Sequence, residues 1–182
     1  MFISQQLKKE NIAEYILYMW QVEDLLRSFA FDTDKIEENI INRYPVSDTQ
    51  KQEVTNWYSN LIQMAELENK KESGHLQIFI NIVCDLNDLH SWLLYRQQDI
   101  EYEKIYSDTQ PELEALYEKM EGKIINEVDM CLQGIYAFML MRLQKKEIST
   151  ETENAMYKIT RLIAYLSAKY ADREENPDKY YE

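Results

Sequence analysis

Residues 76–96, LQIFINIVCDLNDLHSWLLYR, form the longest strongly periodic apolar segment of the chain. Large apolar side chains recur there at steps of three and four residues, which places them along one face of an α-helix. This face consists of Phe79, Ile82, Leu86, Leu89 and Leu93, widened by Val83 and Trp92. A strand would need strict alternation of apolar and polar residues, which is absent. We therefore predict a central helix over 76–96, N-capped by Ser73, whose pattern can extend to Tyr106.

Glycine and proline are scarce, with three copies of each in 182 residues. Strand-rich folds need many turns, and turns depend on these residues. The length is that of one ordinary domain. We therefore predict an all-α fold, an antiparallel helical bundle with about five long and two short helices, in a single domain over residues 1–182.

Capping-box spacings mark several predicted helix starts. In this motif a Ser or Thr side chain accepts the backbone N–H of the residue three positions later, and the Glu or Gln side chain at that position accepts the backbone N–H of the Ser or Thr. The pairs are Ser47 with Gln50, Thr109 with Glu112, and Thr150 with Glu153. Apolar periodicity predicts further helices over 10–29, 34–43 and 123–146. The last helix is predicted to end near Ala171, and residues 172–182 to form a frayed tail.

Two features indicate more apolar surface than one core needs. Residues 134–141, GIYAFMLM, are apolar on every side, which predicts burial all round or, as the alternative, a dimer interface. Within the predicted helix 10–29, the apolar residues Leu17 and Trp20 lie away from the main apolar face of the helix. The interface candidates from both features are Leu17, Trp20, Phe138 and Met141.

The formal net charge of −13 disfavours nucleic acid and anionic membranes as partners, since a negative surface repels phosphate groups. The N-terminus does not have the pattern of a signal peptide, and no apolar stretch reaches the length of about 18 residues that indicates a membrane span. Cys84 and Cys131 have no disulfide or metal-ligand spacing. These observations predict a cytoplasmic protein with reduced thiols.

Motifs for metal or nucleophilic chemistry are missing. A carboxylate-bridged di-metal site in a bundle needs Glu-x-x-His on two helices. This spacing occurs once, from Glu72 to His75, and Ser73 and Gly74 are expected to place it across a loop. The chain has only two histidines, no Gly-rich phosphate loop and no nucleophile motif. We predict no metal and no cofactor, and the sequence favours a non-enzymatic protein without deciding the question.

His90 lies at the edge of the predicted core face of the helix 76–96. A histidine paired with a carboxylate can act as an acid, a base or a switch near neutral pH. The acidic residues at the edges of apolar faces are Glu23, Asp85, Glu127 and Asp129. If such residues converge, they form a candidate site. The ligand-pocket candidates are His90, Asp85, Asp88, Glu23 and Trp92. The favoured interpretation remains that His90 bonds to a neighbour and that the carboxylates face solvent.

The opening FISQQLKKENIAEYILYMWQVEDLLR, residues 2–27, resembles the start of a bacterial protein family known as domain of unknown function 4924. The stretch CDLNDLH, residues 84–90, and the chain length are also similar to that family. The resemblance implies a bacterial, cytosolic, all-helical protein. It implies no site residue, because no activity is established for the family.

Two functional hypotheses remain. The favoured one is a non-enzymatic protein-interaction or regulatory bundle, which can form a homodimer through its excess apolar surface. The alternative is a small-molecule-binding or enzymatic bundle with a site around His90 and neighbouring carboxylates. The geometry discriminates between them, because convergence of His90 and these carboxylates in one concave pocket would favour the second.

Overall fold

The computed structural model describes residues 2–120 and 123–180, and every regular element in this part of the chain is a helix. The α-helices are α1 (Phe2–Glu10), α2 (Ile12–Ser28), α3 (Thr33–Asn39), α4 (Asp48–Leu67), α5 (Gln77–Tyr95), α6 (Ile100–Lys119), α7 (Glu127–Leu143) and α8 (Thr150–Glu175). Short 3-10 helices span Ile41–Arg43 and Pro177–Lys179. The all-α prediction is confirmed.

Six of these helices begin after a polar residue whose side chain accepts backbone N–H groups of the first turn. The caps are Asn11, Asp32, Ser47, Asp99, Asn126 and Ser149. Ser47 forms the predicted capping box with Gln50. The prediction that Thr150 caps the last helix is wrong by one residue, because Ser149 is the cap and its hydroxyl accepts the N–H of Thr152.

The predicted helix start at Thr109 is wrong. Thr109 lies inside α6, where its hydroxyl donates to the Ile105 carbonyl at 2.7 Å, and the helix continues through Pro111. The turns before Thr109 bury Tyr102 and Ile105 in the core. We attribute the longer helix to this burial, which offsets the hydrogen bond that a proline removes.

The predicted helix 76–96 matches α5 to within one residue at each end, and its predicted apolar face packs into the core, with Ile82 and Trp92 half-buried. The predicted cap and the predicted extension of this helix are wrong. Ser73 is not the cap. The carboxylate of Glu23 on α2 accepts the N–H of Leu76 at 2.8 Å, and Glu68 accepts the N–H of Gln77 at 2.7 Å. The helix ends at Tyr95 instead of extending to Tyr106, because a turn and the Asp99 cap start α6 as a separate helix.

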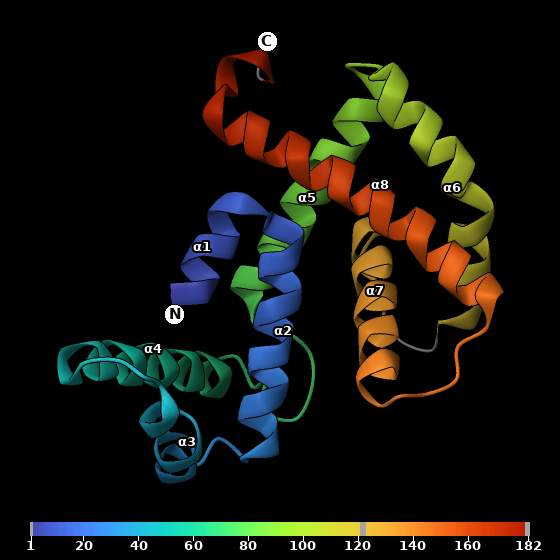
Figure 1. The fold of residues 1–182 in the computed structure, drawn as a ribbon. Helices are drawn as coiled ribbons and strands as arrows, with labels where there is room; N and C mark the ends of the chain where they lie inside the picture. Colours follow the sequence, from blue (N-terminus) through green and yellow to red (C-terminus); the bar gives the residue numbers. More distant parts are fainter. Residues whose placement is uncertain (1, 121–122, 181–182) are drawn as a thin grey trace.

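The last helix, α8, runs obliquely across the molecule and packs against α2, α5, α6 and α7 (Figure 1). α2 and α7 lie side by side, and α3 and α4 form the end of the fold remote from α6 (Figure 1). The largest fully buried side chains include Trp20, Phe79, Leu86, Tyr102, Leu132 and Ile159, which come from α2, α5, α6, α7 and α8. One core therefore joins these five helices.

The predicted frayed tail is ordered as far as residue 180. α8 continues to Glu175, and Arg173 is buried. Tyr180 donates to Asp172 at 2.7 Å and packs on Trp92 with a ring separation of 4.9 Å. The last two positions of the predicted tail lie outside the described residues. Within the part of the chain that the structure describes, no helix is both long enough and apolar enough to cross a membrane.

Two expectations about apolar surface are also wrong. Residues 134–141 are not buried all round, since Gly134 is buried, Ala137 is exposed and the others are half-buried. Trp20, an interface candidate, has an exposed fraction of only 2 % because it packs inside the chain against His75 and Tyr136. The other interface candidates, Leu17, Phe138 and Met141, are half-buried.

Candidate functional site

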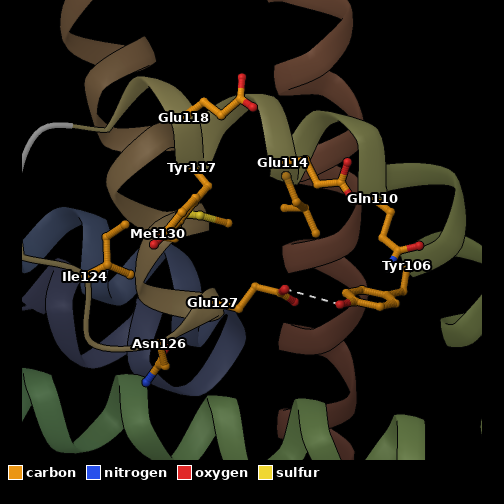
Figure 2. A pocket seen from close by; sticks show the side chains of 10 residues that line it. Tyr106, Gln110, Glu114, Tyr117, Glu118, Ile124, Asn126, Glu127 and Met130 are labelled. Carbon is orange, nitrogen blue, oxygen red and sulfur yellow. Dashed lines mark hydrogen bonds between the residues drawn. The ribbon is translucent and has the colours of Figure 1, made fainter.

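A cavity of about 630 Å³ opens between α6 and the start of α7 (Figure 2). The described residues that line it are Tyr106, Gln110, Leu113, Glu114, Tyr117, Glu118, Ile124, Asn126, Glu127 and Met130. They supply three carboxylates, two amides, two phenol rings and three apolar side chains, with no lysine or arginine among them. The wall is therefore partly apolar and carries negative charge.

Two local features bring these side chains to the cavity. On α6, Tyr106, Gln110, Leu113 and Tyr117 recur at steps of four, three and four residues, so they form one stripe of the helix. On α7, the Asn126 side chain accepts the N–H of Asp129 at 2.8 Å and so fixes the first turn. The first residue of this helix, Glu127, then faces α6. Figure 2 shows the Glu127 and Tyr106 side chains pointing toward each other.

A chain of four polar side chains leads from the cavity into the core. Tyr106 donates its hydroxyl to Oε2 of Glu127 at 3.2 Å (Figure 2). Oε1 of Glu127 lies 3.2 Å from Nε2 of His90 on α5. The other ring nitrogen of His90, Nδ1, lies 2.7 Å from the Tyr102 hydroxyl. Three helices therefore meet through one polar network, of which His90 and Tyr102 form the buried end.

The arrangement of charges indicates where the protons lie in this network. A carboxylate only accepts hydrogen bonds, so the nitrogen of His90 that faces Glu127 carries the ring proton and Nδ1 accepts from Tyr102. Burial raises the pKa of Tyr102 well above its ordinary value, so its hydroxyl keeps its proton. Burial, together with the negative charge of Glu127, raises the pKa of Tyr106 to about 12. Both phenols therefore act as hydrogen-bond donors at neutral pH.

Glu127 has one oxygen that is not fully used. Its Oε1 atom is buried, and no described residue forms a hydrogen bond with it, since the approach of His90 has an ion-pair distance without hydrogen-bond geometry. The side chain as a whole has an exposed fraction of 33 %, on the side of the cavity. A charged carboxylate that its protein partners satisfy only in part has capacity for one more donor or a positive charge, which its exposed part can meet in the cavity.

The ligand-pocket candidates from the sequence do not meet in one place. Asp85, Asp88 and Trp92 line a second cavity of about 370 Å³, in which Asp85 accepts from Arg173 at 2.6 Å. His90 lies on another side of α5, because helix positions two residues apart point in nearly opposite directions. The fifth candidate, Glu23, lies on α2, and its buried side chain contacts the N-terminus of α5. The hypothesis of a single pocket for these five residues is therefore wrong.

Three residues that matter for these sites were not predicted. Tyr102 and Tyr106 lie in the stretch that the sequence predicts as an extension of the helix 76–96. Their spacing of four residues after the capping Asp99 was the available signal. Arg173 lies in the segment assigned to a frayed tail. No group of three or more His, Cys, Asp or Glu side chains within 2–120 and 123–180 is arranged to hold a metal ion.

Comparison with known proteins gives a family but no activity. The family described as "Domain of unknown function (DUF4924)" matches residues 1–177. This chain belongs to that family. The resemblance seen in residues 2–27 and 84–90 is thereby confirmed. No curated protein and no solved structure matches the chain. Membership of DUF4924 assigns no role to any residue, so the functional argument rests on the geometry of the sites.

Proposed function

We propose that this protein binds a small organic cation in the cavity between α6 and α7, with Glu127 as the counter-ion. The observation that carries the proposal is Glu127, a carboxylate one-third exposed at the wall of a 630 Å³ cavity, whose buried Oε1 receives no hydrogen bond from a described residue and is approached only by His90. Cavities of about 300–1,000 Å³ with a few convergent polar groups are typical of small-molecule sites. The protein therefore offers both the space and an unmet charge.

The rest of the wall supports a cationic ligand over an anionic or neutral one. Glu114 and Glu118 add two further carboxylates, and no described lining residue is basic. The phenol rings of Tyr106 and Tyr117 can attract a cation by their π faces. The net charge of −13 favours the approach of cations over anions at long range.

His90 and Tyr102 act as positioning residues in this proposal. His90 approaches Glu127 from the core side, and Tyr102 holds His90 in place by a hydrogen bond, so together they limit the rotamers of the carboxylate. A fixed carboxylate loses less conformational entropy when a ligand binds. The ligand itself would contact Glu127 and the residues of the cavity wall, not the buried histidine.

Calorimetric titration with matched pairs of small molecules tests the proposal. Putrescine and tyramine are the cations, and butanediol and tyrosol carry hydroxyl groups in place of the ammonium groups. The cations are expected to bind and the neutral analogues are not. Glu127→Gln is expected to weaken binding by about tenfold or more, since a hydrogen bond to a charged group contributes about 1.5–3 kcal/mol.

The matched control for Glu127→Gln is Glu147→Gln, at an exposed position between α7 and α8. It removes the same charge without touching the cavity, so it is expected to leave binding unchanged. Urea unfolding of both variants establishes that they are folded. Absence of binding by either cation, or equal binding by both variants, would contradict the proposal.

The interaction hypothesis favoured by the sequence has less support. One of its four candidate residues, Trp20, is buried within the chain. Self-association, a cytoplasmic location and a bacterial source stay predictions. A native mass spectrum of protein purified without stripping ligands would report a dimer mass if the interaction hypothesis holds, and a bound small molecule if the cation proposal holds.

A further inference from the structure

A smaller cavity, distinct from the one between α6 and α7, lies beside Trp20. It has a volume of about 170 Å³ and lies between α2, the segment that precedes α5, α5 itself and the start of α7. The residues that matter in its wall are Trp20, Lys70, His75, Lys123, Asp129 and Gln133. We call it the Trp20–Asp129 cavity. The cation proposal uses none of these residues.

Trp20 brings an unused hydrogen-bond donor to this wall. The exposed fraction of the residue is 2 %, and its Nε1–H has no hydrogen-bond partner within the described parts of the chain. The indole is held on both sides, because it stacks on His75 with a ring separation of 4.2 Å and meets the edge of Tyr136 at 5.7 Å. A buried donor without an acceptor costs about 1–3 kcal/mol, so an occupant that accepts would be stabilising.

Asp129 brings an unused acceptor. The exposed fraction of this residue is also 2 %. Its Oδ2 atom accepts from the N–H of Ile125 at 2.9 Å and from the side-chain amide of Gln133 at 2.8 Å. No described residue donates to Oδ1, and this atom is not fully enclosed by protein, so it is open to an occupant of the cavity that Asp129 lines. Since buried carboxylates are normally paired or fully hydrogen-bonded, this oxygen has capacity for a donor or a cation.

Two lysines supply the opposite charge at the same cavity. Lys70 is half-buried, and its Nζ atom lies 3.3 Å from the position that a Cβ on Gly74 would occupy. Lys123 is exposed. Neither forms an ion pair with a described residue. The cavity therefore presents a buried carboxylate and indole N–H together with two ammonium groups that form no ion pair with a described residue.

We propose that the Trp20–Asp129 cavity binds a small zwitterion, an amino acid of the size of glycine or alanine. The ammonium group of the ligand faces Asp129. Its carboxylate accepts from the indole of Trp20 and pairs with Lys70 and Lys123. The volume of 170 Å³ limits the ligand to this size class. This site is independent of the cation site, so either proposal can fail without the other.

The indole N–H resonance of Trp20 reports directly on the proposed contact. The chain has three tryptophans, and the variants Trp57→Phe and Trp92→Phe assign the Trp20 signal by elimination in ¹⁵N-labelled protein. Alanine is the probe, and propionate and ethylamine are its analogues that lack the amine or the carboxylate. Alanine is expected to shift the Trp20 signal in a saturable manner and to leave the Trp57 and Trp92 signals unchanged. Neither propionate nor ethylamine is expected to shift the Trp20 signal.

Asp129→Asn is expected to weaken the apparent affinity for alanine by about tenfold or more, because it removes the buried charge that faces the ammonium group. Since this buried residue also supports the fold, the exposed Lys123→Gln variant provides a second test and is expected to weaken binding severalfold. Lys145→Gln, an exposed lysine remote from the cavity lining, is the control.

The proposal is overturned by three results. These are no shift with alanine, an equal shift with propionate, or equal affinities of Lys123→Gln and Lys145→Gln. Cross-peaks between the Trp20 indole and long-lived water, with no response to alanine, would show instead that the cavity holds ordered water alone.

Discussion

The carboxylate of Glu23 on α2 accepts the backbone N–H of Leu76 at 2.8 Å and thereby caps the N-terminus of α5, although the two residues are 53 positions apart in the sequence. Its other oxygen lies 2.5 Å from Nδ1 of His75. The first N–H groups of a helix have no partner within the helix, and the positive end of the helix dipole favours a carboxylate. Glu23 therefore connects two core helices by hydrogen bonds as well as by apolar packing.

Replacement of Glu23 by alanine is expected to lower the free energy of unfolding by about 3 kcal/mol, because it leaves a buried N–H and a histidine without their acceptor. Gln21→Ala, at an exposed position on the same helix, is the control and is expected to change it by less than about 0.5 kcal/mol. Urea unfolding measures both. Equal effects of the two substitutions would contradict the capping role.

Tyr102→Phe tests the buried end of the polar network. Phenylalanine keeps the buried ring but removes the hydroxyl that lies 2.7 Å from Nδ1 of His90. We expect the free energy of unfolding to fall by about 1–2 kcal/mol, since the nitrogen of a buried histidine loses its partner. The matched control for urea unfolding is Tyr157→Phe, because the wild-type Tyr157 is 71 % exposed. No difference between the variants would mean that the contact is not stabilising.

The raised pKa values of several tyrosines predict a loss of stability in alkaline solution. Burial, as the main cause, raises the pKa of Tyr106, Tyr170 and Tyr180 to about 12 from the ordinary value of 10.0. Between these values the unfolded chain releases protons that the native protein retains, so stability is complete below pH 10 and falls as the pH rises toward 12. Urea unfolding at several pH values measures the slope.

In Tyr106→Phe this slope is expected to be shallower above pH 10, because one proton fewer is retained by the native state. Below pH 10 the variant and the wild type should differ by a constant amount. A slope that is the same in both proteins would contradict the assignment for Tyr106.

Gly134 on α7 lies against Leu116 on α6. A Cβ atom at position 134 would be 2.8 Å from a terminal methyl of Leu116, so that side chain must move. In the wild-type background, Gly134→Ala is expected to be nearly neutral, because the gain in helix propensity of about 1 kcal/mol is offset by the displacement of Leu116.

In a Leu116→Ala background the same Gly134→Ala substitution is expected to stabilise the protein by about 1 kcal/mol. The double-mutant cycle, measured by urea unfolding, isolates this coupling. Equal effects in both backgrounds would show that the two residues do not limit how closely α6 and α7 approach.

The candidate sites show which site residues a local sequence pattern can identify. His90 was recognisable as a chemically interesting residue, because only two histidines occur and this one lies on an apolar helix face. Its partners were not, since Tyr102 and Glu127 belong to two other helices and nothing in the spacing of one helix specifies which neighbour it meets. Asp85 and Asp88 were assigned to the same pocket as His90, although they face a different part of the fold.

The sequence by itself determined that this protein is all-helical, which residues of α5 face the core, and the cap at Ser47. These are properties of single helices, set by 3.6 residues per turn and by the hydrogen bonds of the first turn. Only the tertiary structure decided that Glu23 caps α5, that Glu127 joins His90 to a cavity and that α8 continues to Glu175. These contacts depend on how distant helices pack, and packing free energy is summed over many side chains that no local pattern contains.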